Sequence, residues 1–206
     1  MPPESPQDHV FHSTEFQGVT QDAIDFFVGT PVCDLPPTLS FKGAGVYALY
    51  YHGDFPLYEK LVQKNGSEFN IPIYVGKTVP PGWRKNRTRD TTKPVLKERL
   101  NQHAGTIRQS SDLTIDHFKC RFVILNGTEG DLIVPLEAGL IRKYSPLWNS
   151  YLDGFGNHPV GKERLTGKLM EWDTLHPGRE WVAKMRGETR DLNPIKQRIL
   201  DVLNRL

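Results

Sequence analysis

The chain has few of the features that mark a secreted or membrane protein. It contains only two cysteines, Cys33 and Cys120, and no C-x-x-C pair. This predicts free thiols in a reducing compartment and no zinc site of the usual spacing. No apolar run approaches the roughly 18 residues of a membrane span. The first ten residues have neither a basic stretch nor an apolar core, so we expect no secretory signal and a cytoplasmic location.

Basic residues are missing from the first forty positions and concentrated further along the chain. Residues 1–40 contain six acids and no Lys or Arg, whereas residues 77–108 contain nine bases and two acids. Segment 77–108 therefore carries +7 in a chain whose total is +2, which leaves −5 for the remainder. This pattern is typical of a surface that binds a polyanion, although a solvated charged loop would have the same composition. We predict DNA contacts from Lys77, Arg84, Lys85, Arg87, Arg89 and Lys93.

Hydrophobic spacing predicts a mixture of strands and helices. Short apolar runs predict strands at 45–51, 71–75 and 118–125. Helical spacing predicts helices at 21–28, around 57–62, at 95–109, from 131 or 135 to 144, and at 195–206. The apolar face of the last helix consists of Ile195, Ile199, Leu200 and Leu203. Residues 1–17, rich in Pro, Ser and His, are expected to form an irregular arm.

Two triplets organise the functional interpretation. Gly45-Val46-Tyr47 begins the first predicted strand, and Tyr74-Val75-Gly76 lies at the end of the second. The other polar candidates follow in the order Arg99, His103, Glu137 and Asn149. Taken singly, each has an ordinary structural interpretation, such as a strand aromatic, a surface histidine, a carboxylate beside an apolar stripe or a turn residue. Taken in this order, the set resembles the GIY-YIG nuclease family.

The same residues can supply the chemistry of phosphodiester hydrolysis. That reaction needs a deprotonated water, neutralised phosphate charge and a stabilised leaving oxygen. Glu137 offers a hard oxygen ligand for a Mg²⁺ ion held largely by water and phosphate, and Arg99 can bind a phosphate oxygen. Either Tyr47 or His103 can take the proton from water. An ordinary phenol has a pKa near ~10 and would need a cation beside it, whereas a histidine titrates closer to neutrality.

The resemblance also implies a fold and an organisation. It covers about residues 45–149 and implies an α+β fold in which helices flank a small antiparallel sheet. We expect one nuclease domain over 1–206, with an arm at 1–40, an insertion at 52–70, a basic loop at 77–94 and an extension at 150–206. The insertion is either a structural flap or a contact for DNA or a partner. The catalytic residues implied by the resemblance are Tyr47, Tyr74, Arg99, His103, Glu137 and Asn149, with Glu137 also the metal ligand.

Within the family, an Arg and a His four residues apart are similar to the type II restriction endonuclease branch. The compact size is similar to the enzymes that cut the GC-rich palindrome CCGCGG. The resemblance implies a bacterial, cytoplasmic homodimer in which each subunit cuts one DNA strand. It also implies Mg²⁺ as cofactor, with Mn²⁺ as a substitute, and a cognate DNA methyltransferase. Tyr47 is the base that the family favours, with Tyr74 contacting phosphate or water and Asn149 fixing the geometry.

Two other functions remain open at this stage. A structure-specific or repair-type DNA nickase could have the same core and would act as a monomer. A non-catalytic nucleic-acid-binding module could use Trp83 and the basic loop for stacking and phosphate contacts. The combination of Glu137, Arg99 and His103 argues against the second alternative, because binding alone does not need it.

Overall fold

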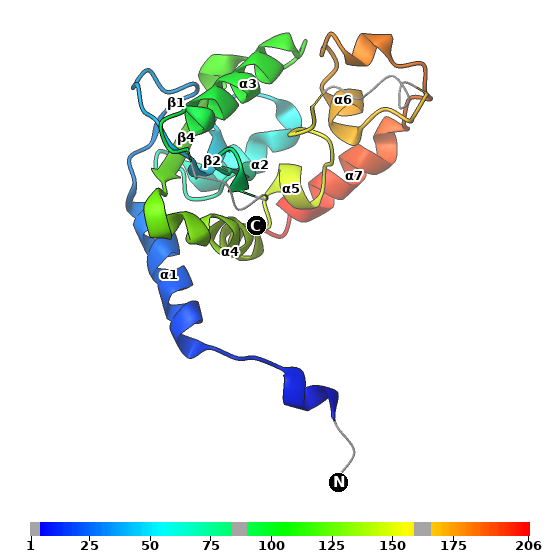
Figure 1. Ribbon diagram of the computed structural model, residues 1–206. Coiled ribbons are helices and arrows are strands. Elements are labelled where there is room, and N and C mark those ends of the chain that lie inside the picture. Colours follow the sequence, from blue (N-terminus) through cyan, green and yellow to red (C-terminus); the bar gives the residue numbers. More distant parts are fainter. Residues whose placement is uncertain (1–4, 84–89, 159–165) are drawn as a thin grey trace.

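The computed structural model describes residues 5–83, 90–158 and 166–206 (Figure 1). Its centre is a four-stranded antiparallel sheet in the order β1-β4-β2-β3. The strands are β1 (Cys33–Asp34), β2 (Gly45–Tyr51), β3 (Tyr74–Thr78) and β4 (Phe118–Ile124). Every residue of β2 is buried, because helices cover both faces of the sheet around it. The predicted α+β class, a small antiparallel sheet flanked by helices, is confirmed.

Both triplet glycines lie where neighbouring atoms leave no room for a side chain. In the β2–β3 register, Tyr47 lies opposite Gly76. A Cβ at Gly76 would lie 2.4 Å from the Tyr47 hydroxyl oxygen, and one at Gly45 would lie 1.9 Å from the Val123 carbonyl oxygen. The glycine that begins the first triplet and the glycine that ends the second are therefore required by the packing of β2, β3 and β4.

The alternation of side chains along β2 divides the core into two layers. Val46, Ala48 and Tyr50 pack against α1 (Thr14–Gly29) and α4 (Ile133–Tyr144). Figure 1 shows these two helices together on one side of the sheet. The alternate residues of β2 pack against α3 (Val95–Gln109), whose stripe of Leu96, Leu100, Ala104 and Ile107 is completely buried.

The C-terminal segments extend the second layer. They comprise α5 (Leu147–Ser150), α6 (Glu171–Leu175), η7 (Val182–Lys184) and α7 (Leu192–Leu203). Helix α7 buries Ile195, Ile199 and Leu203 in the same core as α3. It also contacts η2 (Pro56–Tyr58), which precedes the short helix α2 (Glu59–Asn65) between β2 and β3. The predicted helix in the 52–70 insertion therefore exists and ends at Asn65, with Gly66 as its C-cap, as the Asn-Gly pair indicates.

The remaining elements are short turns of 3₁₀ helix. They are η1 (Pro6–His9), η4 (Ile115–His117) and η5 (Gly127–Leu132). The segment before α1 extends away from the sheet (Figure 1), and Phe11 is 87% exposed. Cys33 and Cys120 face each other across β1 and β4 as free thiols, with their sulfurs 3.5 Å apart. Within the described ranges, no helix combines the length and apolarity needed to span a membrane.

Several predicted boundaries at the N-terminal side were wrong. Helix α1 begins at Thr14 instead of residue 21, because the Ser13 side chain caps it by accepting a hydrogen bond from the Phe16 amide at 3.0 Å. The irregular arm is correspondingly shorter than 1–17. Strand β1 was not predicted, because two residues among prolines carry no periodic signal. Strand β3 begins at Tyr74 instead of 71, since Asn65 bonds both backbone groups of Ile71 in a turn.

Smaller differences occur in the later elements. Strand β4 ends one residue before the predicted 125, and α4 begins at Ile133, between the two predicted starts. Helix α7 spans Leu192–Leu203 instead of 195–206, because the Asp191 carboxylate caps it through the Asn193 amide at 2.9 Å. Leu200, expected on its apolar face, is 41% exposed.

Candidate active site

A hydrogen bond between a strand and a helix forms the centre of the candidate site. Tyr47 projects from β2 and His103 from α3, and the hydroxyl of the tyrosine lies 2.6 Å from the imidazole Nε2. Both side chains are buried, at 1% and 2% exposure. The alternative interpretation of His103 as a surface histidine is therefore wrong. The ring of Tyr74, from β3, lies 6.3 Å from the Tyr47 ring and 5.3 Å from the His103 ring.

Arg99 lies one helical turn before His103 and is anchored by its surroundings. Its NH2 group donates to the Gly156 carbonyl at 2.6 Å, and its NH1 group donates to Gln102 Oε1 at 3.0 Å. His158 Nε2 lies 3.2 Å from the same NH1. Burial raises the pKa of both tyrosines, and the positive charge of the Arg99 guanidinium offsets only part of that rise.

Glu137 comes from α4, on the other side of β3, and forms an ion pair with Lys77. Lys77 follows the second triplet directly, so the pair joins the end of β3 to α4. The carboxylate is close enough to Tyr47 and Tyr74 to raise the pKa of both phenols. Lys77 was predicted as a DNA contact, and the structure places its ammonium group at the candidate metal ligand instead of in open solvent.

Asn149 acts on the backbone of the second triplet. Its side-chain oxygen accepts a hydrogen bond from the Val75 amide at 2.7 Å, and its side-chain nitrogen donates to the Val75 carbonyl at 2.8 Å. Strand β3 is an edge strand, so these two groups would otherwise lack a partner on that side. The Asn149 amide therefore holds the backbone of Val75, the residue next to Tyr74.

Burial controls the protonation of the central pair. Desolvation raises the pKa of Tyr47, and the neighbouring Tyr74 raises it further. Desolvation also raises the pKa of Tyr74. For His103, burial lowers the pKa well below its usual value, and the charges of Arg99 and His158 act in the same direction. At neutral pH the pair is therefore a protonated phenol beside a neutral imidazole, which has a nitrogen that can accept a proton.

The donor set fits a metal ion held by a single protein carboxylate. Within the described residues, no group of three or more His, Cys, Asp or Glu side chains could hold a metal. Glu137 is a partly buried hard oxygen ligand whose present neighbour is a cation. A Mg²⁺ ion that keeps several waters and uses substrate phosphate oxygens needs no more than one or two carboxylates.

Most of the predicted DNA-contacting residues lie outside the described part of the chain. These are Arg84, Lys85, Arg87 and Arg89, which fall within residues 84–89. Lys93 is described, with its side chain 60% exposed and its ammonium 3.9 Å from the Asp90 carboxylate. The exposure of Lys93 fits a phosphate contact, whereas the Lys77 ammonium is already paired with the Glu137 carboxylate.

The sequence analysis missed four residues around this site. Phe155, Gly156 and His158 lie in a loop after α5, and Arg179 follows α6. They line a cavity of about 390 Å³ together with Arg99 and His103. The glycines at 154 and 156 are the signal that the sequence offers there, and the segment does not match a phosphate-loop pattern.

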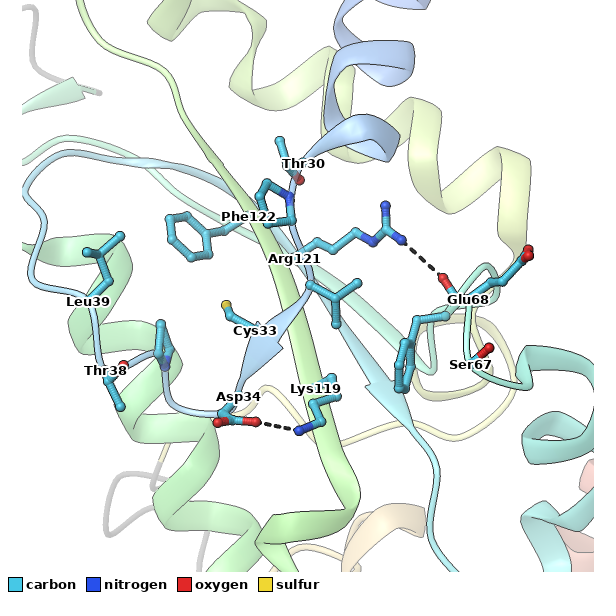
Figure 2. Close-up of a pocket in the computed structure, with 14 residues that line it drawn as sticks. Thr30, Cys33, Asp34, Thr38, Leu39, Ser67, Glu68, Lys119, Arg121 and Phe122 are labelled. Atoms are coloured by element: carbon cyan, nitrogen blue, oxygen red, sulfur yellow. Dashed lines mark hydrogen bonds and ion pairs between the residues drawn. The ribbon is translucent and has the colours of Figure 1, made fainter.

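A larger cavity, of about 690 Å³, lies elsewhere and contains none of the six catalytic candidates. Figure 2 shows it at the β1 edge of the sheet, where Asp34 and Lys119 form an ion pair. Arg121 donates to the Glu68 carbonyl beside it at 3.1 Å. The candidate chemistry is therefore separate from this larger cavity.

The fold and the cluster define a nuclease. Tyrosines from two adjacent antiparallel strands approach an Arg–His helix on one side and a lone carboxylate on the other. The family model described as the Eco29kI GIY-YIG domain matches residues 39–203, which is most of the chain. The chain therefore belongs to the GIY-YIG nuclease family, in its restriction endonuclease branch. A comparison with curated proteins finds no match.

Proposed function

We propose that the protein is a type II restriction endonuclease that cuts both strands of DNA at a specific site, with one Mg²⁺ ion per active site. The observation that carries this proposal is the convergence of Tyr47, His103 and Arg99 on one side of β3 with Glu137 on the other. A binding module would not need a buried tyrosine–imidazole hydrogen bond next to an anchored guanidinium. Membership of the restriction branch supports the same conclusion.

The tyrosine and the histidine act as a relay in this proposal. The Tyr47 oxygen takes a proton from the attacking water while its own proton passes to His103 Nε2, 2.6 Å away. No free phenolate forms, so the raised pKa of Tyr47 does not block the step. The lowered pKa of His103 keeps its imidazole neutral and ready to accept. The question of whether Tyr47 or His103 is the base then becomes a question of which one touches the water.

The other polar groups bind and orient the substrate. Arg99 holds a phosphate oxygen with the part of its guanidinium that Gly156 and Gln102 do not use. Tyr74 donates its hydroxyl hydrogen to phosphate or water, and Asn149 keeps β3 in place beneath it. Glu137 would hold Mg²⁺, or Mn²⁺ as a substitute, and the ion would supply charge neutralisation at the phosphate. The Lys77 ammonium, which is paired with Glu137 in the structure, would then be available to contact DNA.

A homodimer follows from the double-strand cut, and an apolar surface supports it. Cutting both strands of a palindrome requires two sites related by a two-fold axis. The outer side of α1 and the segment before it expose an unusual number of large apolar side chains, namely Val10, Phe11, Phe16, Val19 and Phe26. We propose that a second copy of the chain covers this surface, since monomers rarely expose such patches.

The finer assignments rest on the family resemblance. We propose the palindrome CCGCGG as target, a bacterial cytoplasmic location and a cognate DNA methyltransferase that protects the host site. We also propose that residues 1–206 form a single nuclease domain, since the match extends through the C-terminal extension. The alternative function is that of a repair-type nickase with the same core, which would act as a monomer.

One experiment tests the class. Unmethylated phage and plasmid DNA carrying CCGCGG is incubated with the protein and Mg²⁺, beside EDTA and CCGCGG-methylated controls. We expect discrete metal-dependent fragments whose ends map to that sequence. Nicked circles alone would favour the nickase. A retarded band without cleavage, weakening as salt rises, would overturn the catalytic assignment.

A further inference from the structure

We propose that Arg179 is a positioning residue that clamps the loop at residues 154–158 against Arg99 and His103, so that the C-terminal extension completes the active site. This inference rests on the proposed nuclease function. It adds to that function a residue that lies outside the tyrosine triplets and outside the 45–149 core. A series of contacts leads from Arg179 through the loop to the two candidate catalytic side chains.

Arg179 is buried to an extent that is unusual for an arginine. It is only 2% exposed and forms an ion pair with Asp173, which is equally buried. Its guanidinium lies 5.0 Å from the ring centre of Trp172 and 4.7 Å from that of Trp181. Two aromatic rings and a carboxylate therefore hold the guanidinium in one orientation.

The donors that Asp173 does not use bind backbone carbonyls of a single loop. The NH2 group of Arg179 donates to Gly154 at 3.0 Å, and the NH1 group donates to Phe155 at 3.3 Å and Asn157 at 3.5 Å. A loop of this kind lacks regular backbone partners, so its buried carbonyls need donors from elsewhere. Arg179 supplies them and thereby fixes the path of residues 154–157.

The same loop contacts the candidate catalytic residues. The Phe155 ring stacks on the His103 imidazole, with centres 4.8 Å apart and planes inclined by 16°. The Gly156 carbonyl accepts the 2.6 Å hydrogen bond from Arg99. A Cβ at position 156 would lie 2.4 Å from the Tyr74 hydroxyl oxygen. The loop therefore sets the orientation of the guanidinium and the imidazole and touches the second tyrosine.

Arg198 provides a matched control. It also forms an ion pair with a carboxylate, Glu171, and donates to a backbone carbonyl, that of Tyr151 at 2.9 Å. Its contacts join α7 to α6 and do not include residues 154–158. Replacing either arginine removes an ion pair in the C-terminal region, but only Arg179 touches the loop.

The first test compares Arg179→Met with Arg198→Met under conditions where circular dichroism shows both variants folded. Single-turnover DNA cleavage with Mg²⁺ and DNA binding with Ca²⁺ are measured. We expect Arg179→Met to lower the cleavage rate by about 10²-fold, because small displacements of catalytic groups have effects of this size. We expect DNA affinity within about 3-fold of wild type. Arg198→Met should cleave at nearly the wild-type rate, and equal losses in both variants would overturn the proposal.

Two further measurements keep the test decisive. In an Arg99→Lys background, adding Arg179→Met should slow cleavage much less than it does in the wild type, because both changes act through one contact. Full additivity would contradict the clamp. Hydrogen–deuterium exchange without DNA or metal should quicken at residues 154–158 in Arg179→Met and not in Arg198→Met. If Arg179→Met does not fold, Arg179→Lys, which retains the buried charge but loses the fork of donors, replaces it in every arm.

The exchange measurement separates this inference from the proposed function. If the wild-type protein cleaves no DNA, the nuclease assignment fails, while the exchange data still show whether Arg179 holds the loop. If the wild type cleaves and exchange at residues 154–158 does not respond to Arg179→Met, the clamp is wrong and the nuclease assignment stands.

Discussion

The described residues include two tyrosine–histidine hydrogen bonds of the same length, in different surroundings. Tyr47 lies 2.6 Å from His103 Nε2, and Tyr58 lies 2.6 Å from His176 Nε2. In both pairs, burial lowers the pKa of the histidine. In the second pair, each side chain has a further polar partner. Trp148 Nε1 donates to the Tyr58 hydroxyl at 2.9 Å, and His176 Nδ1 lies 3.0 Å from the Asp112 carboxylate.

The first pair has charged groups beside it that could act on a substrate. His103 and Arg99 line the same cavity, and Glu137 is near enough to affect Tyr47. The tyrosine–histidine bond alone therefore does not distinguish a catalytic pair from a structural one. The first pair differs in having the Arg99 cation and a cavity beside its histidine, and a carboxylate, Glu137, near its tyrosine. Each of the following predictions tests this difference between the two pairs.

The largest effect is expected at Glu137, the carboxylate near the tyrosine of the first pair. Glu137→Ala should reduce DNA cleavage by at least about 10³-fold, since a metal ion supplies several kcal/mol of transition-state stabilisation. DNA binding, measured in Ca²⁺ by gel retardation, should persist. Glu129→Ala, an exposed glutamate just before α4, serves as control and should cleave normally. Loss of folding or of DNA binding to the same degree would contradict the assignment of Glu137 as metal ligand.

The next effect compares the two hydroxyl groups directly. Tyr47→Phe should slow cleavage by about 10²–10⁴-fold, the usual size of a lost proton transfer. Tyr58→Phe should leave the cleavage rate unchanged but lower the free energy of unfolding by about 1–3 kcal/mol, because Trp148 and His176 lose a buried partner. Single-turnover kinetics and chemical denaturation measure the two quantities. Near-wild-type cleavage by Tyr47→Phe would move the base role to His103.

The first pair could be predicted from the sequence and the second could not. Tyr47 belongs to a triplet, and His103 lies one turn from Arg99 on a helix whose limits of 95 and 109 follow from Pro94 and the leucine stripe. Tyr58, Asp112 and His176 come from three segments with no common pattern. Their contact depends on how the C-terminal region packs, which local periodicity does not encode.

The same limit explains what was missed around the candidate site. Phe155 and Gly156 lie in an irregular loop, and Arg179 reaches them from beyond α6. A hydrophobic pattern identifies which face of a helix is buried, but it does not identify which loop carbonyls a distant arginine binds. Asn149 was predicted through the family resemblance, and its bonds to Val75 became visible only in the structure.

Acid should destabilise the protein through both histidines, and more through the first. A buried neutral imidazole has a folded-state pKa below that of the unfolded chain, about 6.5. The unfolded state therefore binds more protons below pH 6.5, and stability falls as pH decreases, by up to about 1.4 kcal/mol per pH unit for each histidine. Asp112 partly offsets the lowering at His176, so its contribution ends at a higher pH than that of His103.

Denaturation curves between pH 7.5 and 5 measure this difference. His103→Gln should remove more of the pH dependence than His176→Gln, while both variants retain a side chain that can hydrogen-bond the tyrosine. The pKa of His52 is also lowered by burial, and its contribution cancels because it is present in every variant. Equal pH dependence in the His103→Gln variant and the wild type would show that His103 is not held neutral in the fold.

The smallest effect is expected at Asp112, the carboxylate next to His176 in the second pair. Asp112→Asn leaves an oxygen that can accept the His176 hydrogen bond but removes its charge, so the free energy of unfolding should fall by about 0.5–1.5 kcal/mol at neutral pH. The loss should grow toward pH 5.5, because Asp112 supports the protonated imidazole. Asp22→Asn on the exposed side of α1 is the charge-matched control.

The cleavage rate of Asp112→Asn decides whether the two pairs are independent. Trp148, which bonds Tyr58, also packs against Phe155 with ring centres 4.4 Å apart, and Phe155 stacks on His103. These contacts form a physical path from the Tyr58–His176 pair to the candidate site. If each pair keeps its own geometry, cleavage is unchanged because the aromatic rings do not move when a charge behind His176 is removed. A rate more than about 10-fold lower would instead make Asp112 and His176 part of the support of the active site.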